Sequence, residues 1–198
     1  DKNGVAIGGK SRRKAVFAYL GKQKHMERAP SVLRTRIYVD GYNFYNGCLK
    51  HTSYKWLDLN KLFSIILPTI LIPGNADGAL ESELLPLALK YFTAPILRNF
   101  ARSNDSVPSQ VRYHDALRAH LGSSIEIIHG YYDAKPARAY LYTEGKSPLH
   151  SEMREIWKIE EKQSDVSMAL HAYADAKRGD VDQVVIATND TDLEQIGR

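Results

Sequence analysis

Four aspartates stand where carboxylates converge in many α/β proteins. Asp40 follows the apolar run Ile37-Tyr38-Val39, and Asp190 and Asp192 follow a second run of branched apolar residues. Asp165 lies at the start of a segment with helical periodicity that leads into this second run. In an open parallel sheet, ligands bind beyond the carboxyl ends of the strands. The sequence therefore predicts that these carboxylates share one site.

Four carboxylates brought together without matching cations repel one another and raise one another's pKa. A divalent cation removes this repulsion, and oxygen ligands favour Mg²⁺ or Mn²⁺ over zinc. Such an ion can lower the pKa of a bound water and orient a phosphodiester. We therefore expect a Mg²⁺ or Mn²⁺ site that hydrolyses a nucleic-acid backbone, with ligands Asp40, Asp165, Asp190 and Asp192.

Each aspartate also has a purely structural interpretation. Asp165, Asp190 and Asp192 lie at or near expected helix starts, where the helix dipole favours a carboxylate even without a metal. Asp40 is followed by Gly41, a pair that is not expected to cap a helix but could form an ordinary turn.

Strand-like and helix-like segments alternate from Thr35 onward, which predicts an α/β domain with a mostly parallel sheet. Strands are expected at 36–39, 87–94, 125–129 and 183–187, and helices at 57–67, 108–121 and from Ser164, which would be the N-cap. The segment 133–161 is expected to be less regular. In the last of these helices, one buried stripe should contain Val166, Ala169, Leu170, Tyr173 and Ala174. A further helix is expected after Asp190, and because the chain stops at Arg198, the C-terminal part of the fold is expected to be missing.

The composition fits one principal domain, because the chain has 198 residues and 43% hydrophobic content. A single cysteine, Cys48, allows neither a disulfide framework nor a cysteine zinc site, which favours a reducing, cytoplasmic location. The longest apolar runs are shorter than the roughly 20 residues that a membrane helix needs, so no membrane association is expected.

Positive charge is concentrated near the N-terminus. Residues 1–35 contain nine Lys or Arg and two acidic residues, whereas residues 36–198 carry a net charge of −3. We therefore divide the chain into a basic arm, 1–35, and one domain, 36–198. The arm suits attraction to the phosphates of RNA, and with equal weight it could be a solubilising extension.

Five separated blocks run in the same order as in a known family. They are Tyr38-Val39-Asp40-Gly41-Tyr42-Asn43-Phe44-Tyr45, Lys55-Trp56-Leu57-Asp58-Leu59, Lys90-Tyr91-Phe92-Thr93-Ala94, Glu160-Glu161-Lys162-Gln163-Ser164-Asp165-Val166 and Thr188-Asn189-Asp190-Thr191-Asp192-Leu193. On these blocks, residues 36–196 resemble the NYN domain proteins, a branch of the PIN-like nucleases. The resemblance implies a PIN-like three-layer α/β/α fold, Mg²⁺- or Mn²⁺-dependent ribonuclease activity and a metal cluster at the four aspartates. It also implies that Asn43 lies beside the cluster and takes part in catalysis.

The predicted function is a metal-dependent ribonuclease, expected to be an endonuclease, whose partner is RNA. Contacts to the RNA are expected from Asn43, Lys162 and Asn189. One alternative is a non-catalytic NYN module that binds RNA or another partner. Another is nucleotide hydrolysis by Gly4–Ser11, which matches the phosphate-loop pattern G-x-x-x-x-G-K-S. Only three residues precede this motif, too few for the buried strand that a phosphate loop requires, so a chance match is expected.

Several aromatic residues can be assigned either to the core or to a binding surface. Trp56, Tyr91 and Phe92 are expected in the core rather than at a binding surface. His129, Tyr131 and Tyr132 lie at the end of the strand expected at 125–129, where they could contact a substrate.

Overall fold

The computed structural model describes residues 4–6, 16–21, 32–69 and 81–190. Its strands are β1 (Gly4–Ala6), β2 (Val16–Gly21), β3 (Val32–Asp40), β4 (Glu81–Thr93), β5 (Ile125–His129), β6 (Tyr131–Tyr140), β7 (Met153–Lys162) and β8 (Gln183–Thr188). Its α-helices are α1 (Gly41–Phe44), α2 (Leu59–Ile66), α3 (Ser106–Leu121) and α4 (Ser164–Arg178). Within these ranges, no helix is both long enough and apolar enough to cross a lipid bilayer.

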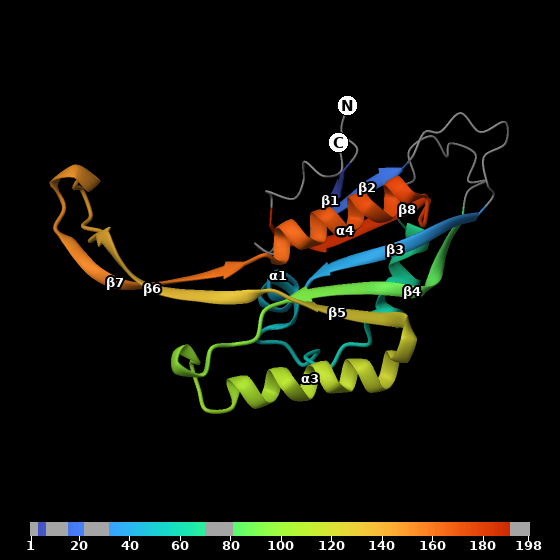
Figure 1. Cartoon of the computed structure of the whole chain (residues 1–198), viewed down its shortest axis with the longest axis horizontal. Coiled ribbons are helices and arrows are strands. Elements are labelled where there is room, and N and C mark those ends of the chain that lie inside the picture. Colours follow the sequence, from blue (N-terminus) through green and yellow to red (C-terminus); the bar gives the residue numbers. More distant parts are fainter. Residues whose placement is uncertain (1–3, 7–15, 22–31, 70–80, 191–198) are drawn as a thin grey trace.

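A six-stranded sheet with the order β1-β2-β8-β3-β4-β5 forms the centre of the molecule (Figure 1). Strands β8, β3, β4 and β5 are parallel, whereas β1 and β2 are antiparallel additions at the β8 edge. The prediction of an α/β fold with a mostly parallel sheet is confirmed. Strands β1 and β2 lie within the segment expected to be a basic arm, and β3 begins before residue 35.

Alternating residues of the central strands pack against helices on opposite faces of the sheet. Ile37 and Val39 join one core cluster, which includes Leu59 and Phe63 of α2 and Leu117 of α3. On the other face, residues of β3, β4 and β8 pack against α4, in a cluster of Tyr38, Phe92, Met168, Ala172, Val181, Val184 and Ile186. Because the strands are buried on both faces, they consist largely of apolar residues, which is why the sequence revealed them.

Two sequence predictions about secondary structure are wrong. Residues 133–161 are not irregular but form most of a long antiparallel hairpin, in which β6 pairs with β7 over ten residue pairs. Pro136 and three nearby alanines hide the strand pattern of β6 in the sequence. Helix α4 begins as expected, but its N-cap is Gln163, which has a left-handed backbone with φ of 75°.

The predicted orientation of α4 is also wrong. Val166, Leu170 and Tyr173 are 65%, 61% and 61% exposed, so the expected buried stripe faces outward. The buried face instead carries Met168 and Ala172, together with two polar residues, Ser164 and Asp175. The spacing of apolar residues alone did not predict the buried face of α4, because this face includes polar residues. Among the aromatic residues expected in the core, Tyr91 and Phe92 are buried, but Trp56 is 61% exposed.

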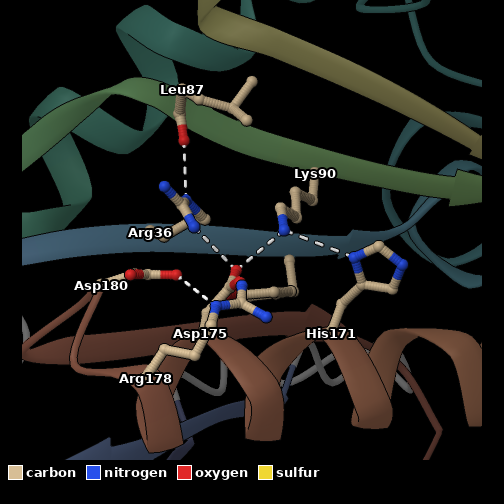
Figure 2. A network of polar contacts seen from close by, with 8 residues as sticks. Arg36, Leu87, Lys90, His171, Asp175, Arg178 and Asp180 are labelled. Carbon is tan, nitrogen blue, oxygen red and sulfur yellow. Dashed lines mark hydrogen bonds and ion pairs between the residues drawn. The ribbon is translucent and has the colours of Figure 1, made fainter.

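A buried carboxylate, Asp175, connects α4 to the sheet (Figure 2). Its side chain is 1% exposed, and its Oδ2 atom accepts hydrogen bonds from Arg36 Nη1 at 2.7 Å, Lys90 Nζ at 2.8 Å and the Tyr38 hydroxyl at 2.5 Å. Arg178 donates to the other carboxylate oxygen. Burial by itself raises the pKa of Asp175, but the donated hydrogen bonds, led by that of Lys90, outweigh burial and lower the pKa to about 2. The charged carboxylate therefore holds α4 against β3 and β4.

Replacing Asp175 with Ala should strongly destabilise the fold, because Arg36 and Lys90 would remain buried without this anion. We expect the free energy of unfolding, measured by urea denaturation at neutral pH, to fall by about 3–5 kcal/mol. The folded-state pKa lies below the ordinary value of 3.8, so the carboxylate stabilises the fold above about pH 4. The difference between wild type and variant should therefore shrink as the pH falls from about 4 to 2.

The matched control is Asp115→Ala, which removes an exposed ion pair with Arg118 on α3. That change should alter the free energy of unfolding by less than about 1 kcal/mol. Equal effects of the two substitutions would contradict the role given to Asp175.

Candidate active-site cleft

A cleft of about 430 Å³ lies at the carboxyl edge of the sheet, where β3, β7 and α4 meet. Its lining residues are Asp40, Tyr42, Asn43, Glu161, Lys162, Gln163, Ser164, Asp165, Val166 and Asp190. Asp40 ends β3, Asp190 follows β8, and Asp165 lies in the first turn of α4. Three of the four aspartates singled out in the sequence are thus brought together, and Asp192 lies outside the described residues.

Of the three residues expected to contact RNA, two line the cleft and one does not. Asn43 and Lys162 line the cleft, and Lys162 forms an ion pair with Glu160 at 2.8 Å. Asn189 does not line it: the residue is exposed, and its side chain lies so close to Gly47 that a Cβ there would come within 3.2 Å. Asn189 thus packs beside Gly47, and its expected contact with RNA stays a prediction.

The carboxylate of Asp40 is 3% exposed and surrounded by hydrogen-bond donors. Its Oδ1 accepts from the Asn43 backbone N–H at 3.0 Å, and its Oδ2 accepts from Asn43 Nδ2 at 2.7 Å and from Thr188 Oγ1 at 2.8 Å. The first of these bonds makes Asp40 the N-cap of α1, so the expectation that Asp40 does not cap a helix is wrong. Asp40 links the ends of β3 and β8 and sets the floor of the cleft.

Glu161, near the end of β7, also lines the cleft. Its two carboxylate oxygens accept hydrogen bonds from Ser164 Oγ at 2.5 Å and from the Tyr132 hydroxyl at 3.3 Å. Burial, and then the neighbouring charge of Glu161, raise the pKa of Tyr132, so Tyr132 remains a neutral donor. Gly130 permits this arrangement because a Cβ there would overlap the Lys162 carbonyl oxygen. Glu161 lies within one of the sequence blocks that resemble NYN domains, but it was not predicted as a site residue because β7 was not recognised as a strand.

The arrangement of donors does not favour a metal ion. Across the described ranges, no group of three or more His, Cys, Asp or Glu residues is positioned to hold one. Both oxygens of Asp40 already accept hydrogen bonds from Asn43 and Thr188, which satisfies this carboxylate without a cation. The prediction of a Mg²⁺ or Mn²⁺ cofactor is therefore wrong.

The chain is similar to the 6-hydroxy-3-succinoylpyridine 3-monooxygenase HspA of Pseudomonas putida (strain DSM 28022 / S16), with 50% identity over 176 residues. The match takes up 86% of this chain and 56% of that protein, so the chain spans little more than half of the relative's length. No protein-family model matches the chain. No solved structure matches it.

This similarity overturns the functional prediction made from the sequence. The predicted metal-dependent ribonuclease is wrong, because a protein with 50% identity over most of the chain is a monooxygenase. The same finding overturns the two alternatives, a non-catalytic RNA-binding module and a nucleotide hydrolase. Most of the Gly4–Ser11 motif also lies outside the described residues. Acidic residues at strand ends suggested a metal site, but the type of residue alone did not reveal which carboxylates are already satisfied by protein donors.

The bond from Thr188 to Asp40 can be tested with Thr188→Val, which keeps the side-chain shape and removes the hydroxyl. Thr188 is 2% exposed, so the variant leaves a buried carboxylate short of one donor. We expect the free energy of unfolding to fall by about 1.5–3 kcal/mol in urea denaturation. Thr69→Val, at an exposed hydroxyl, should change it by less than about 0.5 kcal/mol. A Thr188→Val protein as stable as wild type would show that this bond does not hold the cleft floor.

Proposed function

We propose that the chain is the part of a monooxygenase that binds a hydroxylated nitrogen heteroaromatic ring in the cleft between β3, β7 and α4. The observation that carries this proposal is the 50% identity to a 6-hydroxy-3-succinoylpyridine 3-monooxygenase. The match takes up 86% of the chain, so a single aligned region of that extent has to include the central residues from Asp40 to Asp165. The cleft wall formed by Glu161, Ser164 and Asp165 therefore belongs to the region that the two proteins share.

The size and lining of the cleft fit one small polar ring. A volume of about 430 Å³ is in the range of small-molecule sites. Val166 and the Tyr42 ring supply apolar surface, while Glu161 and Asp165 offer acceptors for a ring hydroxyl or N–H. Lys162 is the cation among the described lining residues, and it can exchange its ion pair with Glu160 for the carboxylate of a succinoyl side chain. Lys162 attracts the succinoyl carboxylate, whereas Glu161 and Asp165 repel it. The ring is therefore oriented with its hydroxyl towards the two acidic residues.

The substrate's own chemistry makes a fixed proton acceptor useful. Positions 3 and 6 of a pyridine ring lie opposite each other, so loss of the 6-hydroxyl proton increases electron density at carbon 3. We assign the acceptor role to Glu161, because Ser164 and Tyr132 hold its carboxylate in place. The general base has to lie within hydrogen-bond reach of the proton it takes.

A monooxygenation transfers one oxygen atom of dioxygen to the ring and reduces the other to water, with two electrons from a reductant; a redox cofactor supplies this chemistry when bound. Among the residues that the structure describes, the lining of the cleft includes no His or Cys, which does not fit a redox metal. Nor does it offer the broad apolar surface that binds the ring system of an organic cofactor. The residues of the cleft therefore bind and deprotonate the substrate.

We also propose that the fold is PIN-like and related to NYN domains. In this chain, the carboxyl edge of the sheet binds an aromatic ring instead of a metal ion that hydrolyses RNA. This is supported by the parallel order β8-β3-β4-β5 and by the acidic residues that follow β3 and β8. The RNA partner expected for residues 1–35 stays a prediction.

The proposal predicts that the protein binds 6-hydroxy-3-succinoylpyridine and that Glu161→Gln weakens this binding. A hydrogen bond to a charged acceptor contributes about 1.5–3 kcal/mol, so the dissociation constant measured by calorimetry should rise about 10- to 100-fold. Glu126→Gln, at an exposed residue of β5, should leave it within about twofold. In ¹⁸O₂ with reduced nicotinamide or reduced flavin as electron donor, the hydroxylated product should gain one ¹⁸O atom.

Two results would contradict the proposal. One is a wild-type protein that does not bind the pyridine at millimolar concentration. The other is binding that Glu161→Gln and Glu126→Gln leave equally strong, which would place the ring outside the cleft.

A further inference from the structure

The β6–β7 hairpin forms a two-stranded sheet of its own that reaches away from the six-stranded sheet (Figure 1). Ten residue pairs make it about 33 Å long. A ribbon of two strands has little stability in water unless something packs against one of its faces. Because most of the hairpin extends away from the six-stranded sheet (Figure 1), that sheet does not supply such packing along its length.

One face of the hairpin is apolar. Because side chains alternate along a strand, Met153, Trp157 and Ile159 of β7 share a face, and the register adds Tyr140 and Pro136 of β6. Trp157 is 61% exposed, Tyr140 48%, Ile159 44% and Met153 38%. Only the pair Arg138 and Glu155 interrupts this exposed apolar surface, and a surface of this kind marks a site of protein association.

Among the described residues, the short turn Arg98–Phe100 extends this apolar face. Phe100, in the short turn Arg98–Phe100, contacts the Trp157 ring edge-on, with ring centroids 5.9 Å apart. Phe100 is itself 38% exposed. Phe100 and Trp157 together present aromatic surface to the solvent, the residue type that most often anchors an interface.

The charges of the hairpin favour a second copy of the chain over a nucleic acid. Residues 131–162 contain six Lys or Arg and six Asp or Glu, so the segment has no net charge. On the apolar face, Arg138 stands directly opposite Glu155 in the register. In a twofold arrangement, Arg138 of each copy can meet Glu155 of the other, which makes the face complementary to itself. RNA would require an excess of positive charge.

The edges of β6 and β7 are unsuited to pairing with a further strand, so association through a face of the hairpin is favoured. Pro136 in the middle of β6 has no backbone N–H to donate, and Lys158 and Lys162 lie along β7. Both features discourage edge-to-edge pairing in natural sheets.

We propose that the apolar face of the β6–β7 hairpin is a self-association surface, through which two copies of the chain pack face to face about a twofold axis. The interface buries Trp157, Ile159 and Met153 of both copies. It leaves the opposite face, with Asp133, Lys158 and Glu160, in solvent. This surface is separate from the proposed ring-binding role of the cleft.

Two isoleucines of β7 provide a matched test. Ile159 and Ile156 are 44% and 45% exposed, but they lie on opposite faces of the hairpin. Sedimentation equilibrium should show a wild-type dimer whose dissociation constant rises at least tenfold in Ile159→Lys and changes less than twofold in Ile156→Lys. Because both residues are exposed in the single chain, both variants should keep the wild-type circular dichroism spectrum, which shows that they fold. A monomeric wild type, or equal effects of the two substitutions, would overturn the proposal.

A charge exchange tests the twofold arrangement. Arg138→Glu and Glu155→Arg should each weaken the dimer, because like charges then face each other across the axis. Mixing the two variants should restore association, since a mixed dimer has two opposite-charge contacts. Failure of the mixture to associate more tightly than either variant alone would overturn the twofold packing.

Discussion

Compensation of the buried charge on Asp175 is the constraint on which the placement of the cleft depends. A carboxylate that is 1% exposed is tolerated only if donors surround it, and Arg36, Tyr38 and Lys90 supply them from β3 and β4. These residues and Asp175 belong to different elements, so satisfying the carboxylate fixes α4 on the sheet. The first turn of α4 is thereby directed to the carboxyl edge, where Asp165 and Asp40 line the same cleft.

The same physical rule operates inside the cleft on a smaller scale. Asp40 and Glu161 are both held by protein donors, namely Asn43 and Thr188 for the first and Ser164 and Tyr132 for the second. Such carboxylates are oriented before any ligand arrives, which lowers the cost of binding a polar ring. An acidic cleft of this kind can serve as a hydrogen-bond acceptor for an organic substrate and does not require a cation.

The sequence was sufficient to predict the central strands and the convergence of Asp40, Asp165 and Asp190 on one cleft, because buried parallel strands are continuous apolar runs. It failed for α4, whose buried face includes Asp175, since a partnered charge looks like a surface residue in a sequence. It failed for the hairpin because Pro136 and its alanines conceal a strand. The chemistry was wrong for a related reason: Asn43 and Ser164 lie three residues from the carboxylates that they bind, but Thr188 and Tyr132 reach these carboxylates from distant parts of the chain.

The central claim is that this cleft binds the ring of a hydroxylated pyridine, and a crystal structure of the complex with 6-hydroxy-3-succinoylpyridine tests it most directly. We expect the ring between Asp40 and α4, with its hydroxyl oxygen within about 3 Å of a Glu161 carboxylate oxygen. The succinoyl carboxylate should lie towards Lys162. A ring bound elsewhere on the molecule, or one whose hydroxyl contacts none of the cleft carboxylates, would contradict the account.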